Sequence, residues 1–193
     1  GVRALTVIEN EPERLAQIKG ITKEKALEIS IELKRVYGIR ELMAFLGAYG
    51  VRPEETVLVW KEYGEGSVSC IQEDPYCLCG EGLDISFDIA DTIAQSMELP
   101  YDDSGRVQAG VLYVMRHNLE NGHTCLPVDK LCRAAQQMLG VELEAVRDAV
   151  YTLCQGFQLH CESFHEREFL FLQKQAQCEQ YIAARMKSML RMP

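Results

Sequence analysis

A cluster of lysines surrounds one glycine near the start of the 193-residue chain, in the stretch Lys19-Gly20-Ile21-Thr22-Lys23-Glu24-Lys25. A glycine turn that opens a helix exposes backbone N–H groups at the helix N-terminus, and these groups bind anions. A phosphate bound there is contacted through the protein backbone, so the site reads no base sequence. We therefore expect phosphate binding at Lys19, Gly20, Ile21, Thr22, Lys23 and Lys25.

Cysteine and histidine side chains are numerous enough for a metal site, but their spacing does not fit one. The chain has eight cysteines and four histidines, and Cys77 and Cys79 have only one residue between them. Paired zinc ligands are usually separated by two to four residues. Because no secretory leader is visible, we interpret the cysteines as reduced, mostly buried thiols of a cytoplasmic protein. We expect no metal.

Acidic side chains outnumber basic ones, and most of the excess lies in the first half of the chain. The chain has 20 Lys and Arg against 29 Asp and Glu, a net charge of −9, of which −8 falls in residues 1–100. A protein that coats nucleic acid or an anionic membrane needs the opposite balance. With 47% apolar residues the chain is that of a globular protein, and no apolar run is long enough to span a membrane. A local phosphate site needs only one or two cations and remains compatible with this charge.

The glycine turn belongs to a repeat that occurs three times. When Ile21, Val51 and Ile85 are aligned, the copies begin 30 and 34 residues apart. The residues matched by this alignment are Ala26, Thr56 and Ala90, and then Ile29, Val59 and Ile93. Each turn is expected to open a helix whose apolar positions lie one turn apart. A short helix over Thr6–Leu15, with Pro12 at the start of its second, turn-like part, is expected to precede the first turn.

These repeats resemble the helix-hairpin-helix modules of DNA repair and recombination proteins. The hairpin of that family reads apolar-x-Gly-apolar-Gly, followed by a helix with an alanine in its first turns. The first copy keeps Gly20 and has Thr22 at the second glycine position. The second keeps Gly50, but Arg52 replaces the second glycine and Pro53 removes an N–H donor. The resemblance implies sequence-independent DNA contact at the first hairpin, and also at Gly50 and Arg52 in the second.

The third hairpin departs furthest from the family pattern. Asp84 and Ser86 stand at its two glycine positions, and Asp88 and Asp91 follow in the helix. Carboxylates at these positions repel phosphate. We therefore interpret the third hairpin as an architectural element.

A different organisation begins after a polar turn at residues 101–105. The apolar spacing predicts a helix through Val107 and Leu119, a short strand within 122–127, and two further helices that end at Gly140 and near Gly156. An alternating stretch from Phe157 to Cys161, a polar turn and an apolar stretch at 169–172 predict a two-stranded wing. This order is typical of a winged helix. The outward face of its third helix is mixed and mostly acidic, which favours a spacer or protein-docking role over base reading.

The predicted fold is therefore mainly α, with three domains or segments. Helix-hairpin-helix repeats occupy 1–100, a winged-helix-like domain with a small β-hairpin occupies 105–172, and a helix occupies 173–193. That last helix carries an apolar face formed by Ile182, Met186, Met189 and Leu190. We expect it to lead toward a domain that the sequence does not include.

The whole chain resembles the region ahead of the motor in RecD-like ATP-dependent DNA helicases, the exodeoxyribonuclease V alpha subunit family. The resemblance is carried by Glu73-Asp74-Pro75-Tyr76, by the stretch from Ile85 to Asp91, by the Gly122-His123-x-x-Leu126-Pro127 turn and by the helix at 177–183. It implies a parent protein that uses ATP and magnesium and moves along single-stranded DNA in recombination and repair. The implied partners are single-stranded or junction DNA and the motor domains of the same protein.

No catalytic residue is expected in this chain. An ATP-binding loop ends in Gly-Lys-Ser/Thr, and the sequence contains no Gly-Lys dipeptide. Some hairpin-repeat proteins are DNA glycosylases with a catalytic Asp, but Asp74 is explained as the start of a helix. Two functions remain open: a DNA-binding accessory region, and a scaffold that docks the motor or a repair partner without binding DNA.

Overall fold

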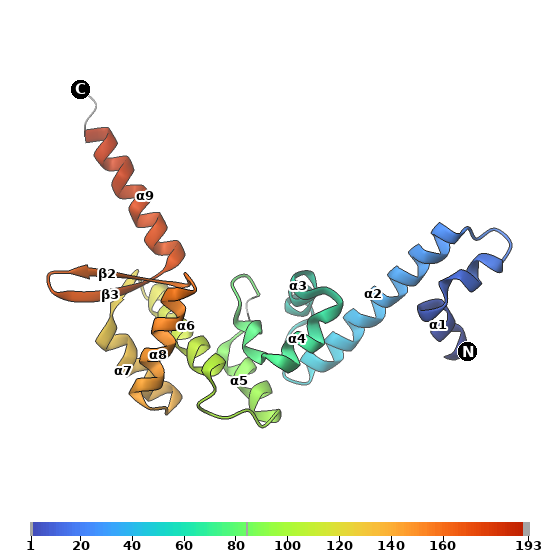
Figure 1. Ribbon diagram of the computed structural model, residues 1–193, viewed down its shortest axis with the longest axis horizontal. Coiled ribbons are helices and arrows are strands. Elements are labelled where there is room, and N and C mark those ends of the chain that lie inside the picture. Colours follow the sequence, from blue (N-terminus) through green and yellow to red (C-terminus); the bar gives the residue numbers. More distant parts are fainter. Residues whose placement is uncertain (1, 84, 191–193) are drawn as a thin grey trace. The chain divides into compact units, whose positions relative to one another are not determined.

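A computed structural model describes residues 2–83 and 85–190, with the side chains of residues 2–4 left aside. Contacts between residues divide the chain into two compact units, 1–93 and 94–193 (Figure 1). The division falls a few residues before the boundary that the polar turn suggested, and it assigns the last helix to the second unit. No helix among the described residues is long and apolar enough to cross a membrane.

The first unit is built from α-helices and short 3-10 helices. In chain order these are α1 (Val2–Asn10), η1 (Pro12–Gln17), α2 (Lys23–Gly47), α3 (Pro53–Tyr63), η2 (Gly64–Gly66), α4 (Ser67–Glu73), η3 (Pro75–Cys79) and α5 (Phe87–Ser96), which crosses into the second unit. The short helix predicted over Thr6–Leu15, with a second, turn-like part from Pro12, is two separate helices that extend beyond these bounds. Pro12 has no N–H group and clashes with a preceding turn, so α1 ends at Asn10 and η1 begins at Pro12.

The aligned repeat positions are buried to different extents. Ala26, Thr56 and Ala90 are all at most 1% exposed, as their shared place in the repeat predicts. At the next aligned position, Val59 and Ile93 are fully buried, whereas Ile29 is 37% exposed. The second and third hairpins therefore belong to the core of the unit, and the first hairpin lies at its margin.

The second and third hairpins each have a close internal contact. The Trp60 ring of α3 packs on Gly38 of α2, where an added Cβ would lie 2.3 Å from the ring. The Tyr76 ring stacks on Phe87 with centroids 5.8 Å apart, and its hydroxyl donates to the Asp91 carboxylate at 2.7 Å. These contacts give the Asp74-Pro75-Tyr76 stretch a structural role.

The second unit contains four helices and a small antiparallel sheet among the residues described. Its elements are α6 (Ser104–Glu120), β1 (Cys125–Pro127), α7 (Val128–Leu139), α8 (Leu143–Gln155), β2 (Leu159–Phe164), β3 (Arg167–Leu172) and α9 (Gln173–Leu190). The strand order is β1-β3-β2, with Leu126 opposite Leu170 and Cys161 opposite the same residue. The order of the elements is the one that the apolar spacing predicted.

The wing differs from its prediction at both ends. The polar turn is only His165-Glu166, both with positive φ, so β2 and β3 extend through residues expected in the turn. Phe157 does not belong to β2. It lies between α8 and β2 with φ +56, in the left-handed region.

The core of the second unit is formed by the apolar faces of α6, α7 and α8 against β3. Its fully or nearly buried members include Val107, Val111, Met115, Leu131, Ala135, Val146, Leu153 and Leu170. In contrast, Ala176 is the one buried residue of α9 among those described. The apolar residues near the end of α9 are open to solvent, and Figure 1 shows this helix (red) extending beyond the strands.

Candidate nucleic-acid interface

The first hairpin places its predicted phosphate-binding residues around the N-terminus of α2. Gly20 has φ +97, and the Ile21 N–H donates to the Ile18 carbonyl at 3.1 Å, which closes the turn. Thr22 is the N-cap of α2, and its hydroxyl oxygen accepts from the Lys25 backbone N–H at 3.2 Å. Thr22 therefore replaces the second glycine of the family pattern with an ordinary helix cap.

The charges at this turn favour a bound anion. The first two N–H groups of α2, at Lys23 and Glu24, have no acceptor within the helix. The side chains of Lys19, Lys23 and Lys25 are all exposed. Lysines in the first turn of a helix are unfavourable next to the positive end of the helix dipole, and a bound phosphate would relieve that repulsion. The structure thus brings together all six residues that the sequence predicted for the first hairpin.

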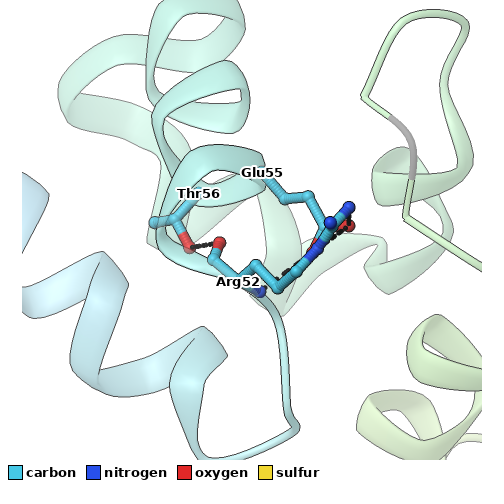
Figure 2. A network of polar contacts seen from close by, with 3 residues as sticks. All are labelled: Arg52, Glu55 and Thr56. Atoms are coloured by element: carbon cyan, nitrogen blue, oxygen red, sulfur yellow. Dashed lines mark hydrogen bonds and ion pairs between the residues drawn. The ribbon is translucent and has the colours of Figure 1, made fainter.

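The second hairpin also has a glycine with positive φ, but it carries its own anion. Gly50 has φ +81, and the Arg52 N–H donates to Glu55 Oε2 at 2.9 Å. The Arg52 guanidinium donates to Glu55 Oε1 through Nη2 at 2.6 Å and through Nε at 3.0 Å (Figure 2). The Thr56 hydroxyl adds a bond to the Arg52 carbonyl at 3.1 Å. A carboxylate therefore occupies the N-terminus of α3.

The Glu55 carboxylate is firmly ionised in this setting. The Arg52 guanidinium, followed by the Arg52 backbone N–H, lowers the pKa of Glu55 below its ordinary value. Glu55 is only 9% exposed. Sequence reasoning missed it, although a glutamate three residues after the N-cap is a recognised capping pattern. DNA contact at Gly50 and Arg52 remains a prediction.

The third hairpin is consistent with an architectural interpretation. Asp84 lies outside the described residues, and Ser86 and Asp88 are exposed beside the start of α5. The Asp91 carboxylate accepts the hydrogen bond from the Tyr76 hydroxyl described above, so its role is structural.

The Asp74 carboxylate caps η3. Its Oδ1 accepts from the Tyr76 backbone N–H at 2.9 Å. This contact accounts for Asp74 as a helix start, as the sequence predicted, and gives no support to a glycosylase-like role.

The cysteines show no metal-binding arrangement in the described part of the chain. Burial raises the pKa of Cys77, Cys132 and Cys154, so these thiols are poorly ionised. Burial likewise raises the pKa of the Tyr63 phenol to about 12, and its hydroxyl donates to the Cys77 carbonyl at 3.0 Å. Tyr63 and Cys77 are both half-buried, and their contact is structural.

Part of the sequence is similar to known proteins. Residues 35–125 match the family model of the ATP-dependent RecD2 DNA helicase HHH domain. This match includes the second and third hairpins and ends in β1, so the lysine cluster at residues 19–25 lies before it. The chain is also 27% identical over 129 residues to the ATP-dependent RecD2 DNA helicase of Deinococcus radiodurans. The aligned region is 66% of this chain and 18% of that protein.

Proposed function

We propose that the chain, whose residues 35–125 match the HHH domain of ATP-dependent RecD2 DNA helicases, is a non-catalytic DNA-binding and DNA-positioning region of such a helicase. The observation that carries the proposal is the first hairpin, where exposed N–H groups and three exposed lysines surround one helix N-terminus. The ligand is the sugar-phosphate backbone of single-stranded or junction DNA, bound without regard to sequence.

The remainder of the parent protein supplies the motor in this proposal. ATP and magnesium act there, and the motor domains of the same protein are the partners of this region. A role in recombination and repair, in the cytoplasm, follows from the resemblance to the exodeoxyribonuclease V alpha family. The lack of a Gly-Lys dipeptide supports a chain that does not hydrolyse ATP.

A lysine variant tests the first hairpin. In Lys19→Gln/Lys23→Gln/Lys25→Gln, binding to a fluorescein-labelled oligothymidylate, followed by anisotropy over a salt series, should weaken at low salt. Loss of three phosphate contacts makes the fall of log affinity with log salt less steep, by up to about 2 in the slope. The matched control is Lys34→Gln/Lys61→Gln/Lys130→Gln, which removes three exposed lysines elsewhere and should leave the slope unchanged. Equal behaviour of the two variants would exclude the first hairpin as the phosphate site.

A protein-docking scaffold is the second candidate, and α9 favours it. Ile182, Met186 and Met189 lie along one face of this helix and are 55%, 58% and 66% exposed. An amphipathic helix usually buries such a face against another element. The scaffold function predicts no measurable DNA affinity, together with co-purification of this chain with the separately expressed remainder of its parent protein. That co-purification should be lost in Ile182→Ser/Met186→Ser.

A further inference from the structure

An exposed aromatic ring stands at the C-terminal end of α8 in a backbone conformation that favours glycine. The Gln158 N–H donates to the Leu153 carbonyl at 2.9 Å, and the Phe157 N–H donates to the Cys154 carbonyl at 3.2 Å. This pair of bonds is the Schellman closure of a helix, whose left-handed position is usually glycine. Here that position is Phe157, with φ +56 and an exposed fraction of 77%.

Packing does not account for Phe157. A left-handed conformation costs a side chain with a Cβ more than it costs glycine, and a ring that is mostly in water gains little from burial. Gly156 is adjacent but has φ −79, so the glycine does not occupy the strained position. Strained backbone conformations cluster at functional sites.

Side chains on α8, the helix that ends just before Phe157, have the chemistry of a base-stacking site. Arg147, Tyr151 and Gln155 follow one another at intervals of four residues, so they share one face of the helix. All three are exposed, Tyr151 by 67%. Arg147 forms no ion pair with a carboxylate in the described part of the chain. The sequence has no acidic residue from 149 to 161, so the acidic character of this helix is confined to its first half.

We infer that Tyr151 and Phe157 form a stacking site for unpaired bases of single-stranded DNA, with Arg147 contacting the adjoining phosphate. The inference rests on the proposed function for the kind of ligand. Aromatic rings next to a cation bind single strands without sequence preference, because every base has a π face. The carboxyl end of α8 carries a partial negative charge, so phosphates lie toward Arg147 and the rings meet base faces. Most of this contact is therefore independent of salt.

Two variants of the full chain test the stacking site. Phe157→Gly and Tyr151→Ala should each weaken oligothymidylate binding by about fivefold or more, the loss expected for one stacked base. The slope against salt should stay at its wild-type value, and binding to a duplex of equal length should not change. Tyr181→Ala is the matched control, because Tyr181 is 70% exposed on α9 and lies outside the proposed site.

The Phe157→Gly variant also separates binding from folding. Glycine relieves the left-handed strain, so the melting temperature should rise while affinity falls. Single-strand affinity within about twofold of wild type in both variants would overturn the inference. An equal loss on duplex DNA would also overturn it and would point to a different contact.

The lysine variant of the first hairpin distinguishes the two proposals. If that variant keeps the wild-type slope while Phe157→Gly loses affinity, the hairpin assignment falls and the stacking site stands. If the lysine variant has a less steep salt dependence while Phe157→Gly keeps wild-type affinity, the hairpin assignment stands and the stacking site falls. A wild-type chain with no affinity for single strands overturns both and leaves this face to a protein partner.

Discussion

Glu55 is the residue that makes the second hairpin different from the first. Its carboxylate fills the N-terminus of α3 and binds Arg52 through both backbone and side chain. In the first hairpin the equivalent position, three residues after the N-cap, is Lys25. A single acid-to-base difference thus separates a turn that holds its own anion from a turn that lacks one.

The lowered pKa of Glu55 predicts how its contribution to stability depends on pH. The folded state holds the Glu55 proton less tightly than the unfolded state, where the pKa is near 4.5. The stabilisation is therefore fully present above that value and is lost as pH falls through the lower folded-state pKa. Glu55→Gln should reduce the free energy of unfolding by about 1–2 kcal/mol at neutral pH.

Urea unfolding at neutral pH and at pH values below 4.5 measures this dependence. The difference in the free energy of unfolding between Glu55→Gln and wild type should become smaller in acid. The control is Glu54→Gln, at an exposed position in the same helical turn. A difference that does not vary with pH would show that the loss comes from packing alone.

At the scale of elements, α2 joins the first two hairpins and depends on a close approach to α3. Gly38 lies inside α2, where alanine would ordinarily stabilise a helix by up to about 1 kcal/mol. An added Cβ would lie 2.3 Å and 2.7 Å from two atoms of the Trp60 ring. Alanine should therefore destabilise the protein at this position instead of stabilising it. Gly38→Ala should cost about 1–3 kcal/mol, because the ring must move out of its site.

Gly47 provides the matched position for this test. It lies at the last residue of α2, and an added Cβ meets no atom within 4 Å. Gly47→Ala should be neutral or slightly stabilising. Thermal and urea unfolding of the two variants, with Trp60 fluorescence as a local signal, compares them directly. Equal effects at both positions would argue against the contact between Gly38 and Trp60.

The sequence predicted most elements, and the misses have local physical causes. The repeat alignment matched Ala26, Thr56 and Ala90, and all three are buried. It could not distinguish exposed Ile29 from buried Val59, because burial depends on neighbouring elements rather than on the repeat itself. Phe157 continued an alternating pattern and was placed in a strand, although hydrogen bonds to α8 hold it in the helix closure.

The candidate sites differ in how far sequence alone could reveal them. The lysine cluster of the first hairpin was visible in the sequence because cations and glycine lie close together in the chain. Phe157 needed coordinates, since a positive φ at phenylalanine leaves no mark in the residue pattern. Arg147 and Tyr151, its proposed partners, share a helix face whose sequence is mixed and polar. The structure was needed to show that both side chains are exposed.

At the scale of the whole molecule, thiol accessibility gives a direct test of the cysteine interpretation. Cys161 and Cys178 are exposed, whereas the other six cysteines are buried or half-buried. A thiol reagent should therefore modify two cysteines rapidly in the native protein and all eight in denaturant. Chelators should leave the melting temperature unchanged. A melting temperature that falls with chelator would reveal a metal that stabilises the fold.

The uninterrupted length of α2 has a mechanical consequence. With 25 residues this helix is about 37 Å long, comparable to the rise of about eleven base pairs (Figure 1). The turns at its two ends therefore cannot grip adjacent phosphates, and the far turn already holds the Glu55 carboxylate. A strand bound at the first turn is fastened at one point and stays free to swivel about it. On the proposed function, the first hairpin by itself would act as a pivot rather than a clamp, and a second contact would have to set the direction in which the strand runs.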